Sequence, residues 1–184
     1  LDRDFNRVWS PELLDGPLDD RELRRARELR PLVDSVDFLL DLHSLRHVAA
    51  PLILCGRQAK GRRLAERLGF PGWIVGDFGH AEGRRLRDDG AFDDPRSDKT
   101  ALLVECGQHW AQPSAAMALG AALRFLVAAG SLSEAAAGEL GAPAAAPSPA
   151  IITVTQAITV ASERFRFVRD FHGLERIARK GTMI

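Results

Sequence analysis

Four groups of residues in this chain have side chains that could bind a ligand or transfer a proton. They are Asn6-Arg7, Asp41 with His43, Arg96, and Glu105. A neutral imidazole is a common zinc ligand, and a nearby carboxylate can orient its ring. A glutamate whose surroundings raise its pKa is suited to act as a general base. An amide beside a guanidinium is suited to recognise a carbonyl and a carboxylate of a small substrate.

Each of these residues also has an ordinary structural explanation. His43 can be a hydrogen-bonded histidine at the end of a strand, Glu105 an exposed strand-end carboxylate, and the arginines surface cations. His47 follows His43 at helical spacing but without the glutamate of the helical zinc-protease motif, so we discount a two-histidine site. Cys106, next to Glu105, points to the opposite face of a strand, which argues against a cysteine nucleophile.

Hydrophobic patterns predict the elements that position these residues. Strands are expected at residues 33–42, 51–55, 73–75 and 100–105. Helices are expected at residues 11–15, 19–31, 60–68 and 113–129. We expect Pro31 to end or bend its helix. Residues 76–99 are polar and predict a long loop with a helical turn near residues 81–87, and loops of this length are often functional.

The pattern changes in the C-terminal quarter of the chain. Residues 134–150 are rich in alanine and proline, which is typical of a linker. From Ile151 the residues are β-branched and partly alternate with polar ones, so residues 151–184 are predicted to begin a small β domain. Residues 1–133, in which strands alternate with helices, are predicted to form an α/β domain.

Composition excludes several classes of protein. The 184 residues include 25 basic and 25 acidic side chains, so the net charge gives no argument for a nucleic-acid or acidic-membrane partner. The two cysteines are too few for a disulfide scaffold. No apolar run approaches the ~20 residues that span a bilayer. We expect a cytoplasmic protein with a small-molecule substrate, no nucleic acid and no membrane partner; a homo-oligomer stays open.

Taken together, three motifs resemble the succinylglutamate desuccinylase/aspartoacylase family, which is related to the zinc carboxypeptidases. The motifs are Asp4-Phe5-Asn6-Arg7, Asp41-Leu42-His43 and Val104-Glu105-x-Gly107. Their order agrees with that family, and the β-rich tail is similar to the family's C-terminal β domain. The resemblance covers nearly the whole chain. It implies a zinc-carboxypeptidase-like α/β domain, with a mixed central sheet flanked by helices, followed by a small β domain.

The resemblance also implies roles for individual residues. His43 would be the third protein ligand of a catalytic Zn²⁺. Glu105 would be the general base that takes a proton from water and later protonates the leaving amine. Asn6 and Arg7 would bind the substrate, and Arg96 matches, less closely, a carboxylate-binding arginine.

The family's first two zinc ligands form a His-x-x-Glu pair that precedes the Asn-Arg motif by tens of residues. We therefore expect these two ligands upstream of Leu1, in a longer parent protein that lacks both termini here. His172-Gly-Leu-Glu175 matches the pair by letter but follows Glu105, and we interpret it as coincidence.

The implied activity is that of a zinc-dependent amidohydrolase, a deacylase. It would cleave an amide of a small N-acyl amino acid, a carbon–nitrogen bond other than a peptide bond. With one of three ligands, the 184 residues alone are expected to be inactive. Two alternatives stay open: a carboxypeptidase- or esterase-like zinc hydrolase, and a non-catalytic binding module that has lost the metal site.

Overall fold

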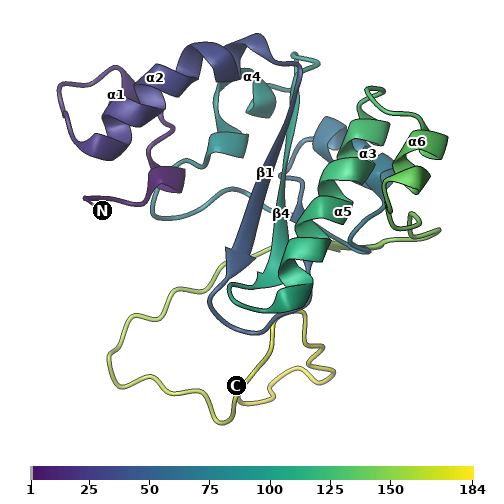
Figure 1. Cartoon of the computed structure of the whole chain (residues 1–184). Helices are drawn as coiled ribbons and strands as arrows, with labels where there is room; N and C mark the ends of the chain where they lie inside the picture. Colours follow the sequence, from purple (N-terminus) through teal and green to yellow (C-terminus); the bar gives the residue numbers. More distant parts are fainter. Residues whose placement is uncertain (1) are drawn as a thin grey trace.

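The structure, a computed structural model, describes residues 2–184 and has a mixed α/β architecture (Figure 1). Within the described residues, five strands form one sheet in the order β1-β4-β2-β3-β5. The strands are β1 (Phe38–Leu45), β2 (Leu52–Leu54), β3 (Trp73–Gly76), β4 (Thr100–Gln108) and β5 (Ala150–Thr153). β2 is antiparallel to β4, whereas the other neighbouring strands are parallel. The sheet is therefore mixed, which confirms the expected fold class.

Helices cover both faces of this sheet. The helical elements are η1 (Phe5–Arg7), α1 (Pro11–Leu14), α2 (Arg21–Ser35), α3 (Ala59–Leu68), η2 (Leu86–Asp88), α4 (Gly90–Asp93), α5 (Gln112–Ala128) and α6 (Glu134–Glu139). Figure 1 shows α1, α2 and α4 on one side of the β1–β4 pair, with α3, α5 and α6 on the other. Each face of the sheet therefore packs against its own set of helices, and each side has its own cluster of buried hydrophobic side chains.

The alternation of side chains along β4 assigns them to these clusters. Leu102, Val104 and Cys106 pack with residues of α3 and α5. Ala101, on the other face, packs with Trp9 and with residues of α1, α2 and α4. Glu105 lies four residues after Ala101 on β4, so the two side chains point to the same face of the sheet. This is the face that the N-terminal segment covers.

Local signals explain where the helices begin and end, with one exception. The Asp20 side chain caps α2 by accepting a hydrogen bond of 2.9 Å from Leu23 N. α3 ends where Gly69 takes a left-handed conformation with φ of 64°. The expectation that Pro31 ends its helix was wrong, because α2 continues to Ser35 with Pro31 inside it. A proline removes one backbone donor but does not by itself stop a helix that packs on a core.

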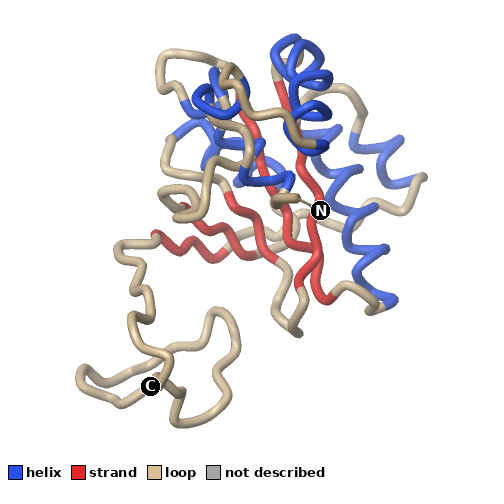
Figure 2. The backbone as a smooth tube through the Cα atoms, turned by 90° about the vertical axis from the view of Figure 1, so that its left-hand side faces the viewer, coloured by secondary structure: helices blue, strands red, loops and turns tan. Residues whose placement is uncertain are grey.

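The C-terminal quarter of the chain corrects the expected linker and strand boundaries. The predicted linker contains α6, whose first turn is capped by Ser133. β5 pairs in parallel with β3, so Ile151 to Thr153 extend the main sheet and do not begin a separate one. Residues 154–184 contain no helix or strand and extend away from the sheet as a long loop (Figure 2). The assignment of this segment to a β domain stays a prediction.

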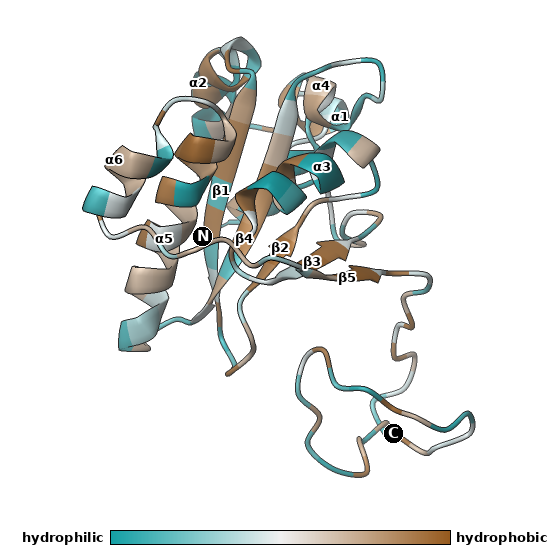
Figure 3. Ribbon diagram, turned by 90° about the vertical axis from the view of Figure 1, so that its right-hand side faces the viewer, coloured by the Kyte–Doolittle hydropathy of each residue, from teal (hydrophilic) through white to brown (hydrophobic). Residues whose placement is uncertain are grey.

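Hydropathy follows the same architecture. Figure 3 shows β3 and β5 mostly in hydrophobic colours, whereas most of the α3 ribbon has hydrophilic colours. Among the described residues, none of the helices combines the length and the apolar character needed to cross a bilayer.

Candidate active site

The two central strands bring His43 and Glu105 next to each other. β1 and β4 are parallel neighbours, and the Cα atoms of His43 and Glu105 are partners in their register. Partners in register project their side chains from the same face of a sheet. Two residues that lie 62 positions apart in the sequence therefore share one site.

The N-terminal segment adds Asn6 to this pair. η1 begins after Asp4, whose Oδ1 accepts a hydrogen bond of 2.8 Å from Asn6 N. Val8 and Trp9, both fully buried, anchor the following residues in the core beneath α2. The side chain of Asn6 then places Nδ2 3.2 Å from His43 Nε2.

The ring of His43 is oriented by Asp41. Asp41 Oδ1 lies 3.0 Å from His43 Nε2, and this hydrogen bond raises the pKa of His43, against the opposing effect of burial. A carboxylate is a stronger acceptor than a neutral group, so we assign the Nε2 proton to the bond with Asp41. The neutral ring then keeps Nδ1 unprotonated, which is the form that binds a metal ion.

Glu105 has the surroundings of a proton-transfer group. Its Oε2 atom is buried and has no hydrogen-bond partner among the described residues. Burial raises the pKa of Glu105, while the nearby charges of His43 and Arg85 act in the opposite direction. A buried carboxyl with a raised pKa accepts and returns a proton more readily than a solvated one.

Arg7 lies beside Asn6 and is largely enclosed. Its Nη1 donates to Asn6 O over 2.7 Å, and its Nη2 lies 3.8 Å from Asp4 Oδ2. The Nε atom is buried with no partner among the described residues. Arg7 therefore lies beside the backbone of Asn6, the residue whose amide contacts His43.

The structure does not bring Arg96 to this group, in contrast to the sequence expectation. Arg96 precedes β4, whereas Glu105 lies near the opposite end of that strand, five residues beyond Thr100 and so about 17 Å away along it. The Arg96 side chain is 88% exposed and binds Asp94. A single sequence spacing cannot show at which end of a strand a side chain lies, and we leave Arg96 out of the site.

Sequence analysis missed a buried group of charges in the long polar loop. Arg85 donates from Nε to Asp88 and from Nη2 to Asp77, over 2.9 and 2.8 Å. Arg87 pairs with the same two carboxylates. Both arginine side chains are at most 5% exposed. The run of charges from Arg84 to Asp89 was visible in the sequence, but such runs are ordinarily solvated, so only the fold shows this one as buried.

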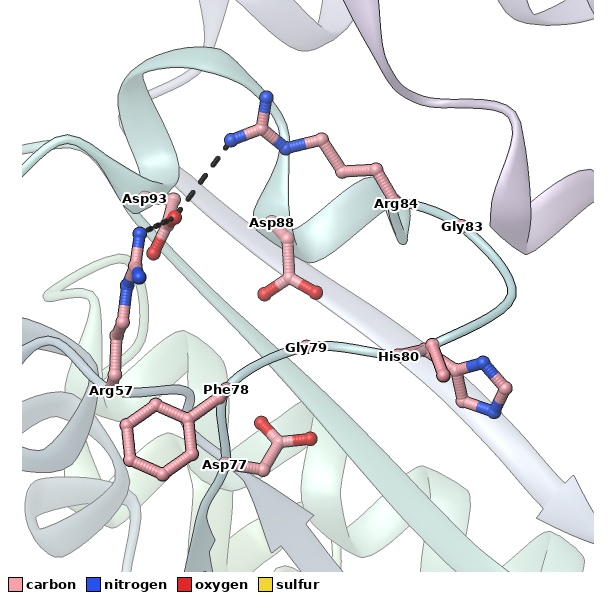
Figure 4. Close-up of a pocket in the computed structure, with 10 residues that line it drawn as sticks. Arg57, Asp77, Phe78, Gly79, His80, Gly83, Arg84, Asp88 and Asp93 are labelled. Atoms are coloured by element: carbon pink, nitrogen blue, oxygen red, sulfur yellow. Dashed lines mark hydrogen bonds and ion pairs between the residues drawn. The ribbon is translucent and has the colours of Figure 1, made fainter. Parts of the chain in front are cut away.

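A cavity of about 370 Å³ adjoins these charges (Figure 4). Asp77 and Asp88 both reach toward it, from the two ends of the loop. Asp93 binds Arg57 over 2.9 Å and lies 3.8 Å from Arg84. The carboxylates around the cavity therefore already have cationic partners from the chain itself.

The described residues offer one candidate position for a metal ion. Residues 2–184 contain no group of three or more His, Cys, Asp or Glu side chains arranged to hold a metal ion. The Asp41–His43 pair fits one position of such a site, because the carboxylate holds Nε2 and leaves Nδ1 for a metal.

The structure also answers the question of a cysteine nucleophile. Cys106 is buried in the cluster beneath α5, on the face of β4 opposite to Glu105. Burial raises the pKa of the Cys106 thiol to about 11. A thiol in such a position is not an activated nucleophile.

Comparison of this chain with known proteins gives matches by structure. No family model and no curated protein sequence matches the chain. Murine aminoacylase 3 is similar with a TM-score of 0.53 and 23% identity, over 70% of this chain and 47% of that one. Succinylglutamate desuccinylase from Vibrio parahaemolyticus has a TM-score of 0.58 and 16% identity, over 92% and 51%.

A product-bound ectoine utilization protein, EutE, from Ruegeria pomeroyi is also similar. Its TM-score is 0.60 and its identity 15%, over 83% of this chain and 44% of that one. The chain thus spans about half the length of these solved structures. At such identities the comparisons establish a shared fold.

Proposed function

We propose that this chain is part of a zinc-dependent deacylase of the succinylglutamate desuccinylase/aspartoacylase type. It would hydrolyse an amide of a small N-acyl amino acid. The observation that carries the proposal is the pairing of His43 with Glu105 on neighbouring parallel strands. The fold shared with aminoacylase 3 and succinylglutamate desuccinylase supports it.

In this proposal, His43 holds the metal through Nδ1 and Asp41 keeps its ring in place. The remaining two ligands, a His-x-x-Glu pair, are proposed to lie N-terminal to Leu1. The chemistry that bound zinc supplies is polarisation of the scissile carbonyl and activation of water.

The remaining residues of the site transfer protons or bind the substrate. Glu105 takes a proton from the attacking water on its unpartnered Oε2 and later gives it to the leaving amine. Arg7 offers a buried donor to the negative charge that develops on the substrate, or to a substrate carboxylate. Asn6, whose amide already contacts His43, binds substrate from the same side.

The direct test is an assay of the full-length protein. Zinc content is measured by mass spectrometry, and hydrolysis of a panel of N-acetyl and N-succinyl amino acids is followed by release of the free amine. About one zinc per chain with hydrolysis of panel members, lost on chelation and restored by zinc, supports the proposal. An intact full-length protein without zinc and without hydrolysis would instead support a binding module.

A pair of arginine variants tests the assignment of the site. We expect Arg7→Ala to lower kcat/KM by about 100-fold, because it removes a donor directed at developing charge. Arg96→Ala, which removes an exposed guanidinium from the other end of β4, should stay within about twofold of wild type. Steady-state kinetics of both variants give the answer, and equal losses would refute the placement of the site.

A further inference from the structure

The amide of Asn6 is oriented by a backbone donor from the long loop. Leu86 N donates to Asn6 Oδ1 over 2.8 Å, so that Nδ2 faces His43 Nε2. An amide has one accepting end and one donating end, and the Leu86 N–H therefore decides which end faces the histidine. Because the Nε2 proton is bound to Asp41, the 3.2 Å approach of Asn6 Nδ2 is a packing contact between two donors and not a hydrogen bond. With the amide reversed, Oδ1 would compete with Asp41 for that proton.

Arg85 holds Leu86 in the place that this contact needs. Its guanidinium binds Asp88 and Asp77 at the same time, and its side chain is 5% exposed. A buried ion pair fixes local geometry, because each partner that is lost leaves an unpaired buried charge. Figure 4 shows that Asp77 and Asp88 come from the two ends of the loop, which Arg85 therefore ties together.

The same loop lies directly against η1. Trp9 N donates to Arg84 O over 3.2 Å, and Val8 and Arg84 form a parallel β-bridge. Gly83 has φ of 145°, and a Cβ atom there would lie 2.4 Å from the carbonyl oxygen of Arg7. A side chain at this position would push the loop away from the residues it supports.

We propose that Arg85, together with Asp77 and Asp88, is a positioning residue for the Asn6–His43–Asp41 arrangement, and that Gly83 permits the close approach. The expected effect on turnover rests on the proposed function, whereas the effect on the geometry does not. Arg85 acts through Leu86 and Asn6 and is not itself a catalytic residue.

Two glycine variants distinguish a loss of the contact between Leu86 and Asn6 from a general effect of strain in the loop. Gly79 has φ of 96°, so an alanine there is strained as well, but its Cβ would make only an ordinary contact of 3.9 Å with Asp88 Oδ2. Gly79→Ala therefore measures the effect of strain in the loop without a clash against Arg7. The readouts are the exchange rate of the Leu86 amide and the ¹⁵N signals of the His43 ring. They are measured by NMR on the full chain without substrate.

We expect Gly83→Ala to accelerate exchange of the Leu86 amide by about 10-fold and to shift the His43 ring signals. Gly79→Ala should change both readouts clearly less than Gly83→Ala does. Unchanged readouts in Gly83→Ala, or the same change in both variants, would overturn the proposal. These measurements keep their meaning even if the wild-type protein shows no deacylase activity.

Arg85 is tested by graded replacement in the activity assay. Lysine is a point charge that reaches one carboxylate at a time, whereas the guanidinium binds both. We expect kcat to fall by about 10-fold in Arg85→Lys and about 100-fold in Arg85→Met, with KM within about threefold. A rise in KM with unchanged kcat would overturn the positioning role. If Arg85→Met does not fold, the kinetics of Arg85→Lys and the NMR readouts of the two glycine variants still test the positioning role of Arg85.

Discussion

Glu105→Gln in the full-length protein should lower kcat for amide hydrolysis by about 10²–10⁴-fold while zinc content stays at the wild-type level. The amide keeps the shape of the side chain but cannot accept and return a proton. Glu139→Gln, an exposed position at the end of α6, is the control and should leave kcat unchanged. Wild-type kcat in Glu105→Gln would exclude Glu105 as the general base.

The same variant should be more stable than wild type at neutral pH. Burial raises the pKa of Glu105 in the folded state above its ordinary value, so the folded protein favours the protonated carboxyl. The free energy of unfolding of wild type therefore falls as pH rises from about 4 through that raised pKa. Glu105→Gln lacks this loss and should therefore be more stable than wild type at pH 7, with no gain below about pH 4.

Urea unfolding at pH 4 and pH 7 measures this difference. A gain of equal size at both pH values would show that the effect comes from packing rather than from the buried charge. The combination of lost turnover with higher stability at pH 7 is typical of a group that the fold retains for function.

Trp9→Ala should produce the largest loss of stability in the chain, about 3–5 kcal/mol. The Trp9 side chain is 0% exposed, and its ring packs edge-on against Phe5 with 5.7 Å between centroids. Its removal leaves a cavity beneath α2, next to the residues that carry Asn6 and Arg7. Trp110→Ala is the matched control, because Trp110 is 92% exposed and should change stability by less than about 0.5 kcal/mol.

Chemical denaturation followed by circular dichroism compares these two tryptophan variants. Similar losses in both would contradict the packing of the N-terminal segment against α2. A large loss in Trp9→Ala alone would show that η1 depends on the core for its position.

Several features of the fold could be predicted from local sequence. The β4 segment is a β-branched and leucine-rich run that ends in a polar residue, and it forms the longest strand. α3 and α5 begin and end within two residues of their predicted bounds. His43 and Glu105 were identified because each ends an apolar run, a pattern that depends only on neighbouring residues.

Other features depend on contacts between distant segments. β5 joins the main sheet by pairing with β3, 77 residues earlier at the Trp73–Ala150 partners, and no local pattern specifies a partner. Arg85 is buried because two aspartates from the same loop surround it, although its sequence neighbours suggest a solvated surface. Arg96 was placed near the site by its weak match to a carboxylate-binding arginine of the family, whereas the fold puts it before the start of β4, away from Glu105.

By itself, the sequence determined which residues are able to do chemistry and which elements carry them. Hydrophobic periodicity and residue type are local properties, and both act before the chain folds. The tertiary structure decided which of these residues meet: His43 with Glu105 through parallel pairing, Asn6 with His43 through the buried Trp9, and Leu86 with Asn6 through Arg85. Strand order and the burial of charge set these contacts, and both are properties of the whole packed chain.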